Sequence, residues 1–217
     1  MSERWVVRKL EDVTSFQNPG RARWAQIRSE LGITAFGINA WESTESEQSL
    51  IGKHDEVGGG AGGHEELYVV LSGHATFTVA GEVVDAPAGK LVFVGDPSVE
   101  REAIAREAGT TVLVVGGKRG ESYTVSAWEK YAEGLGFFGR EEYDKAAEFF
   151  ERAHREDPSQ SRVLYNLACA ESRLGRTDDA LAHLAEAIAR TPSFREAAQA
   201  DPDLEAIRDD PRFPKPE

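Results

Sequence analysis

The sequence predicts two domains of different class, an all-β domain over residues 1–117 and an all-α domain over residues 122–217. In the first part, β-branched and aromatic residues alternate with polar ones between glycine and proline turns, which is typical of antiparallel strands. In the second part, apolar residues recur at helical spacing, and a pattern of small and large residues returns after 34 positions. A chain of 217 residues is long enough for two small domains, each with its own core.

Composition limits the classes of function. The formal charge is −13, and such an acidic chain lacks the basic surface that binding to nucleic acid or to an anionic membrane requires. The single cysteine, Cys169, forms no internal disulfide and is expected to be a buried small hydrophobe within a helix. The first residues lack a signal-peptide core, and no apolar run approaches about 20 residues. We therefore expect a cytoplasmic protein.

The N-terminal region is expected to contain a short arm and one helix. Residues 4–10 read as an edge strand or arm. An Asn-Pro-Gly break follows, and Trp24, Ile27 and Leu31 then recur at helical spacing up to a glycine. This pattern predicts an amphipathic helix over residues 21–31 that covers the β-domain.

Strands are expected along the rest of the β-domain. The sequence predicts strands at residues 33–41 and 49–54, paired as a hairpin around a polar tip. It also predicts strands at 66–71 and 74–79, which are joined as a hairpin at Ser72-Gly73. Three more expected strands lie at residues 90–94, 99–105 and 110–115. The domain then closes near Gly117, and residues 118–120 are expected to form the linker.

Two spacings within these strands resemble the motifs of the cupin family. Glu66 is followed after six residues by Gly73, as in the first cupin motif, and Pro87-x-Gly89 matches part of the second. The resemblance implies that residues 30–117 form a cupin-like double-stranded β-helix, or jelly roll, with Glu66 facing the interior. It also implies that the barrel binds a small molecule.

The ligand histidines of that family are displaced or missing in this chain. The family spacing leads to Gly59, Ala61 and Val92, none of which binds a metal. The nearest substitutes are His54, Glu56 and His64. Alternation places His64, Glu66 and Tyr68 on one face of a strand, and Val92 is expected to look into the same space and make it more apolar.

Two interpretations of this pocket remain open. In the first, His54, His64 and Glu66, with Glu56 in reserve, hold a divalent transition metal such as Fe, Mn, Ni or Zn. In the second, the site is degenerate, and the histidines bond to Glu66 or to the backbone without a metal. A buried ionised Glu66 needs a metal, a histidine or water as its partner. We favour the metal-free interpretation.

The second domain contains an internal repeat. Five residues of the first copy are matched 34 positions later by similar residues: Gly134, Ala146, Phe150, Ala153 and Pro158 return as Ala168, Ala180, Leu184, Ala187 and Pro192. This pattern resembles the tetratricopeptide repeat. We expect two helical hairpins, over residues 127–159 and 161–193, broken near 139–140 and 175–176, and a capping helix over 194–208. The resemblance implies a protein or peptide partner, although two repeats could equally buttress the β-domain.

The favoured function is that of a small-ligand-binding cupin-like protein with a degenerate metal site, whose repeats make protein-protein or interdomain contacts. One alternative is a metal-dependent enzyme of the oxygenase or isomerase type. Another is a non-catalytic dimeric assembly module. We also expect a homodimer, partly built by the apolar arm of Trp5, Val6 and Val7.

Overall fold

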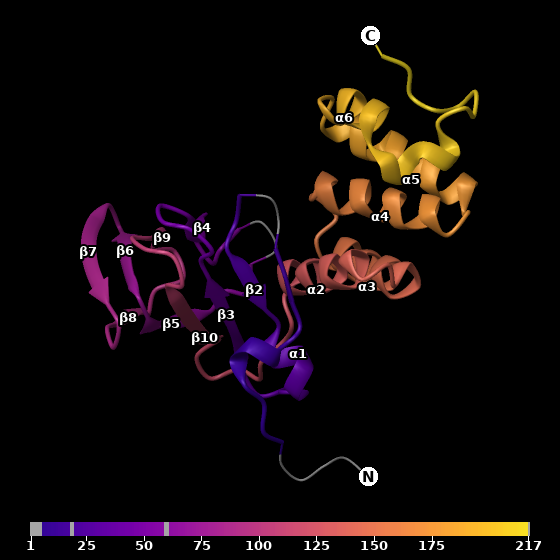
Figure 1. Cartoon of the computed structure of the whole chain (residues 1–217). Helices are drawn as coiled ribbons and strands as arrows, with labels where there is room; N and C mark the ends of the chain where they lie inside the picture. The colour runs from indigo at the N-terminus through magenta and orange to yellow at the C-terminus, as the bar shows by residue number, and fades with distance from the viewer. Residues whose placement is uncertain (1–5, 18–19, 59–60, 217) are drawn as a thin grey trace. The chain divides into compact units, whose positions relative to one another are not determined.

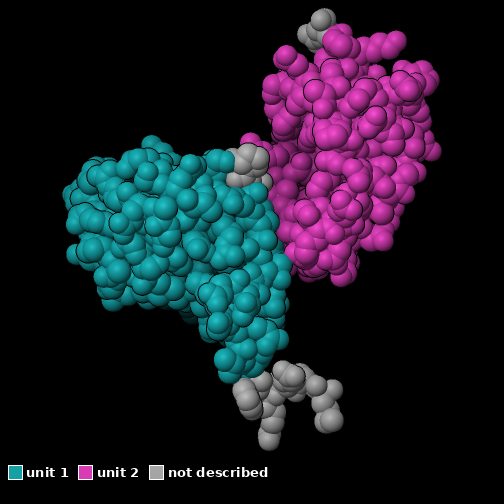
Figure 2. Space-filling model, viewed as in Figure 1, with its two compact units in different colours: residues 1–125 teal, residues 126–217 magenta. Residues whose placement is uncertain are grey.

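The computed structural model describes residues 6–17, 20–58 and 61–216 of the chain. It divides the chain into two compact units, residues 1–125 and residues 126–217, which are distinguished by colour in Figure 2. The first unit contains the strands and the second contains most of the helices (Figure 1). The fold class expected from the sequence, all-β followed by all-α, is confirmed.

The strands of the first unit form two sheets in which all the strand pairs are antiparallel. Along the larger sheet the order is β1 (Ser15–Phe16), β2 (Arg23–Ala25), β3 (Gly37–Glu42), β10 (Thr111–Gly117), β5 (Glu65–Ser72) and β8 (Leu91–Val94). Along the smaller sheet the order is β4 (Ser49–His54), β9 (Arg101–Ala105), β6 (His74–Val79) and β7 (Glu82–Pro87). Strands that follow one another in sequence often lie in different sheets, as a jelly roll requires.

The core of this unit lies between the two sheets. Its buried residues alternate along strands of both sheets, because successive side chains of a strand point to opposite faces. Tyr68 of the larger sheet and Phe77 of the smaller one, both fully buried, meet with ring centroids 5.5 Å apart. A second, smaller cluster on Val13, Ala25, Ile27 and Ala40 involves the N-terminal elements.

Two of the expected strand pairings are wrong. β3 pairs with β2 and β10, whereas β4 pairs with β9 in the other sheet, so these strands form no hairpin. Likewise, β5 and β6 belong to different sheets. The chain changes sheet at Gly73, where φ is +71° and a Cβ would lie 2.5 Å from the hydroxyl oxygen of Thr110. The sequence predicts a turn at this position. It does not indicate that the turn carries the chain from one sheet to the other.

The hairpin of this region is formed by β6 and β7 and was not predicted. These strands pair from Val79↔Glu82 to His74↔Pro87. Between them Ala80 and Gly81 both have positive φ, as in a tight two-residue hairpin turn.

The N-terminal region also differs from expectation. The helix predicted over residues 21–31 is confined to α1 (Ile27–Leu31), and Trp24 instead lies in β2, directly opposite Trp41 of β3. Pairing with β3 thus overrides the helical spacing of the apolar residues. Residues 6–9 form no strand, and a short 3₁₀ turn, η1 (Leu10–Asp12), precedes β1. Trp5 of the expected arm lies outside the described residues.

The helical unit closely follows the prediction. The first hairpin is α2 (Ala127–Gly139) with α3 (Tyr143–Glu156), and the second is α4 (Ser161–Arg173) with α5 (Thr177–Arg190). The cap consists of α6 (Phe194–Ala200) and the 3₁₀ segment η2 (Pro202–Ile207). No helix of the described residues has the length and apolarity needed to cross a membrane.

The repeated small residues lie where helices meet. A Cβ on Gly134 of α2 would come within 2.6 Å of the ring of Phe150 on α3, so glycine permits this close approach. At the end of the unit, Leu204, Ile207 and Phe213 pack into the same cluster as α4 and α5. Cys169 is buried in that cluster, and burial together with Asp201 raises the pKa of its thiol, so it lacks the thiolate character of a reactive cysteine.

Candidate functional site

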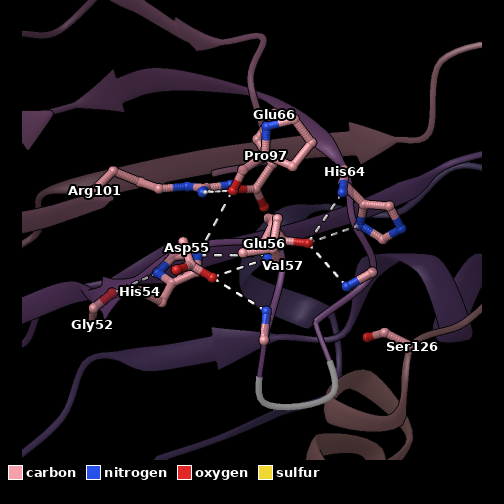
Figure 3. A network of polar contacts seen from close by, with 12 residues as sticks. Gly52, His54, Asp55, Glu56, Val57, His64, Glu66, Pro97, Arg101 and Ser126 are labelled. Atoms are coloured by element: carbon pink, nitrogen blue, oxygen red, sulfur yellow. Dashed lines mark hydrogen bonds and ion pairs between the residues drawn. The ribbon is translucent and has the colours of Figure 1, made fainter. Parts of the chain in front are cut away.

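The candidate site lies at one end of the β unit, where charged side chains of both sheets converge (Figure 3). Glu66 and Tyr68 come from β5 in the larger sheet, and Arg101 comes from β9 in the smaller sheet. His54 ends β4, and Glu56 follows it at the start of the glycine-rich segment. A polar network of this kind is costly between two apolar sheets unless its charges are paired.

Arg101 and Glu66 form an ion pair that joins the two sheets. Both Nη2 and Nε of Arg101 donate to Oε2 of Glu66, at 2.7 and 3.1 Å. The Tyr68 hydroxyl donates to the same oxygen. The side chain of Arg101 is 0% exposed and that of Glu66 is 12% exposed, so neither charge is solvated by bulk water.

Arg101 is also fixed by the backbone. Its Nη1 donates to the carbonyl oxygens of Val99 and Pro97, at 2.8 and 3.3 Å. Its Nε also lies 3.2 Å from the Tyr68 hydroxyl oxygen. All three nitrogens of the guanidinium therefore have partners within the protein.

His54 lies at the more open side of the cluster, between two carboxylates. Its Nε2 is 3.8 Å from Oε2 of Glu66 and 3.7 Å from Oε1 of Glu56. Its Nδ1 is 2.7 Å from the carbonyl oxygen of Gly52, which orients the ring. The His54 side chain is 35% exposed, whereas those of both glutamates are at most 12% exposed.

Glu56 organises the segment that leads from β4 to β5. Its Oε2 accepts hydrogen bonds from the backbone N–H groups of Gly62 and His64, at 3.0 and 3.3 Å. The ring of His64 occupies the space beside Gly62, where a Cβ would come within 2.0 Å of it. His64 is buried, and its ring centroid lies 5.3 Å from that of Tyr123.

The environment shifts the pKa values of the central groups. Burial alone would raise the pKa of Glu66, but the nearby His54 imidazole, the hydrogen bond from Tyr68 and the charge of Arg101 lower it from 4.5 to about 2. Burial alone would lower the pKa of His54, yet the neighbouring Glu66 carboxylate and the hydrogen bond with the Gly52 carbonyl raise it overall. Burial and the Glu66 carboxylate raise the pKa of Tyr68, so the phenol keeps its proton and donates it.

The structure brings some of the expected site residues together and separates others. His54, Glu56 and Glu66 offer ligand atoms that all lie within 4.8 Å of one another. Glu56, the expected reserve, is thus part of the cluster. His64 points its Nδ1 toward Glu56, at 3.6 Å, and does not belong to that trio.

Tyr68 and Val92 are direct partners across β5 and β8, and both are buried in the core between the sheets. Tyr68 reaches the polar cluster through its hydroxyl group, which contacts Glu66 and Arg101. Val92 contributes an apolar side chain to the same core cluster as Val94 and Val70.

Arg101 was not among the residues singled out from the sequence. The expected partners of Glu66 were a metal, a histidine or water, whereas the structure supplies an arginine and a tyrosine together with His54. A signal was present in the strand pattern. Arg101 alternates with Ala103 and Ala105, both fully buried, so the arginine shares the inward face of β9.

The trio fits a metal ion in spacing but not in its hydrogen bonding. Two carboxylates and a histidine are suitable ligands for a divalent transition metal. However, Oε2 of Glu66 already accepts hydrogen bonds from Arg101 and Tyr68, and it is this oxygen that lies nearest His54. A metal bound to Oε2 would have to displace these donors, and a metal bound to the other oxygen, Oε1, would still lie close to the positive guanidinium of Arg101, so the residues as they stand fit a resident metal poorly.

Comparisons with known proteins concern the two units separately. Residues 137–201 match the tetratricopeptide repeat family. No curated protein matches the chain.

Solved structures similar to the chain include a cupin protein from Bacteroides fragilis, with 18% identity and a TM-score of 0.42 over 56% of this chain and 92% of that one. A predicted oxalate decarboxylase from Thermotoga maritima has 18% identity and a TM-score of 0.41 over 51% and 97% of the two chains. A cupin-superfamily sugar phosphate isomerase from Silicibacter pomeroyi has 17% identity and a TM-score of 0.40 over 54% and 75%. The chain is thus similar to cupin proteins over its N-terminal half and to the tetratricopeptide repeat over residues 137–201.

Proposed function

We propose that the β unit binds a small, hydroxyl-rich molecule at the cluster of His54, Glu56 and Glu66, and that the helical repeats contact a protein partner or the β unit. The observation that carries the first part is the position of His54. It is the most exposed member of an otherwise buried cluster, and its Nε2 lies within 3.8 Å of both carboxylates. A ligand that reaches His54 therefore also reaches the edge of the carboxylate pair.

The charges of the site favour a ligand that donates hydrogen bonds. Carboxylates only accept hydrogen bonds when ionised, and the depressed pKa of Glu66 keeps it ionised at neutral pH. Arg101 cannot recognise an anionic group, because its side chain is fully buried and each of its nitrogens has a protein partner. The chain as a whole carries a charge of −13. A neutral polyol fits these conditions better than a phosphate ester.

Binding of neutral monosaccharides and of their phosphate esters to the full chain, followed by calorimetry, tests this proposal. We expect binding of the neutral sugars, and we expect His54→Ala to weaken it by about tenfold or more, as the loss of one hydrogen bond to a charged group would. The matched control is His74→Ala. His74 has similar exposure and a carboxylate partner, Asp85, but lies on β6 away from the cluster. Equal loss in both variants, or a preference for the phosphate esters, would contradict the proposal.

The alternative is a metal-dependent enzyme of the oxygenase or isomerase type. It is supported by the spacing of His54, Glu56 and Glu66, whose ligand atoms lie within 4.8 Å of one another. It requires in addition that Glu66 be released from Arg101 and Tyr68. The metal content of the wild-type protein after incubation with divalent ions and dialysis separates this alternative from the first.

We also propose that the protein forms a homodimer. In its support, large apolar side chains are exposed on the N-terminal segment and on the edge strand β8: Val7 is 74% exposed, and Leu91 and Phe93 are about equally accessible at 61% and 60%. An edge strand with exposed apolar residues favours association with another chain.

Light scattering at tens of micromolar, the order of magnitude at which a stable dimer persists, should give twice the mass of the chain. The variant Leu91→Ser/Phe93→Ser should shift the mass toward a monomer, because it removes the apolar contacts of the edge strand. Val57→Ser, a substitution at a similarly exposed valine that lies outside the strands, should not. A wild-type monomer at this concentration would disprove the dimer.

A further inference from the structure

We propose that the buried guanidinium of Arg101 replaces a divalent metal ion as the cation that neutralises and orients Glu66, so that the site holds its carboxylate ready for a ligand without a metal. The inference concerns the same site as the proposed function but does not require that a sugar bind there. It rests on the position of one charged side chain that bridges the two sheets.

The first step is the coordination of Glu66. Its Oε2 accepts hydrogen bonds from Nη2 and Nε of Arg101, at 2.7 and 3.1 Å, and from the Tyr68 hydroxyl group. A carboxylate oxygen has about two lone-pair directions, so three donors leave Oε2 no direction for a metal–oxygen bond, and a metal would be confined to the other oxygen, Oε1. The oxygen is saturated by groups of the protein.

The second step is the repulsion that a metal would meet. A metal ion bonded to Oε2 lies about 2.0–2.2 Å from that oxygen. Since Nη2 of Arg101 is 2.7 Å from the same oxygen, the ion would lie within about 5 Å of a positive guanidinium in a buried site. Two cations at this separation repel each other, which opposes binding of the ion as long as the arginine stays in place.

The third step is that Arg101 has nowhere to withdraw. Its side chain is fully buried, and Nη1 is bound to the carbonyl oxygens of Pro97 and Val99. Its neighbours on the inward face of β9, Ala103 and Ala105, are fully buried in the core. The arginine is therefore a fixed part of the structure and not a mobile side chain that yields to an ion.

Removal of the arginine should create the metal site that the guanidinium replaces. His54, Glu56 and Glu66 would remain with suitable spacing, and Glu66 would have lost its cation. The full-length protein and the variant Arg101→Met are incubated in turn with Zn²⁺, Mn²⁺ and Ni²⁺, dialysed, and assayed for metal content and melting temperature.

We expect the wild-type protein to retain no stoichiometric metal and to melt at an unchanged temperature. We expect Arg101→Met to retain about one equivalent of at least one of these ions, and to melt several degrees higher in its presence, since a ligand that binds only the folded state stabilises it. The variant Arg101→Met/His54→Ala should lose this gain. Because these readouts involve no sugar, a failure of sugar binding leaves them unaffected.

One equivalent of metal in the wild-type protein, lost on His54→Ala, would overturn the inference. So would a folded Arg101→Met variant that gains no metal. If Arg101→Met does not fold, Arg101→Ala takes its place, because it also removes the positive charge and every arginine donor to Glu66, while the space it leaves admits water. The wild-type measurement decides the matter independently of either variant.

Discussion

Arg101→Met is expected to lower the free energy of unfolding of the β unit by about 3–5 kcal/mol, in the absence of added metal. The substitution keeps most of the aliphatic stem but removes the fully buried cation that contacts Glu66 Oε2. Breaking a buried ion pair from one side is costly, because the remaining charge loses its partner in a region without bulk water. The backbone carbonyls of Pro97 and Val99 lose a donor as well.

Arg106→Met provides the matched control. Arg106 lies just beyond the end of β9 and pairs with Glu47 at 3.5 Å, but its side chain is 53% exposed. An ion pair on the surface contributes about 0–1 kcal/mol, so this variant should unfold almost as the wild type does. Urea denaturation followed by tryptophan fluorescence gives both values. A loss of less than about 1 kcal/mol in Arg101→Met would show that the buried pair does not stabilise the fold.

The second large effect is expected in acid. The pKa of Glu66 in the folded protein is about 2, against 4.5 for the free side chain. Because the folded value is the lower one, ionised Glu66 contributes its full stability above pH 4.5, and this contribution is lost as the pH falls toward 2. The difference between the folded and free pKa values of Glu66 corresponds to about 3 kcal/mol of the free energy of unfolding.

The comparison of wild type with Glu66→Gln, from pH 5 to pH 3, isolates this contribution. The wild type should lose stability more steeply on acidification, by up to about 1.4 kcal/mol per pH unit, since one additional proton is taken up on unfolding. Glu65→Gln is the control, because Glu65 lies on the opposite face of β5 and pairs with the exposed Arg119. Parallel pH profiles for wild type and Glu66→Gln would contradict the shifted pKa.

The helical unit could be predicted from the sequence in detail. The contacts that define this unit join residues close in sequence. The small residues that recur after 34 positions allow the two helices of each hairpin to approach closely. Gly139 ends α2, and Gly175 follows the C-terminal end of α4. Each helix packs mainly on its neighbours in sequence. A single sequence therefore contains most of the information that fixes these elements.

The β unit was harder to predict because its contacts are not local. The individual strands β4, β5 and β6 lie where alternation placed them, but alternation does not say which strands pair. For the same reason the helical spacing of Trp24, Ile27 and Leu31 predicts a helix where the structure has strand β2. Its partner, β3, lies more than ten residues away.

The candidate site shows the same division. The positions of His54, Glu56 and Glu66 near one another follow from the strand ends and from the short segment between them. The role of Arg101 depends on the contact of β9 with β5 across two sheets, 35 residues apart in sequence. A sequence motif therefore identifies Glu66 but does not identify Arg101, the cation that pairs with it.

The central claim is that Arg101 holds Glu66, and a double-mutant cycle tests it most directly. The free energies of unfolding are measured for wild type, Arg101→Met, Glu66→Gln and the double variant, all without added metal. If the two side chains stabilise the fold through one another, the double variant is more stable than the sum of the single losses implies, with a coupling of about 2–3 kcal/mol. Losses that add within about 0.5 kcal/mol would show that the two residues act independently and would contradict the account.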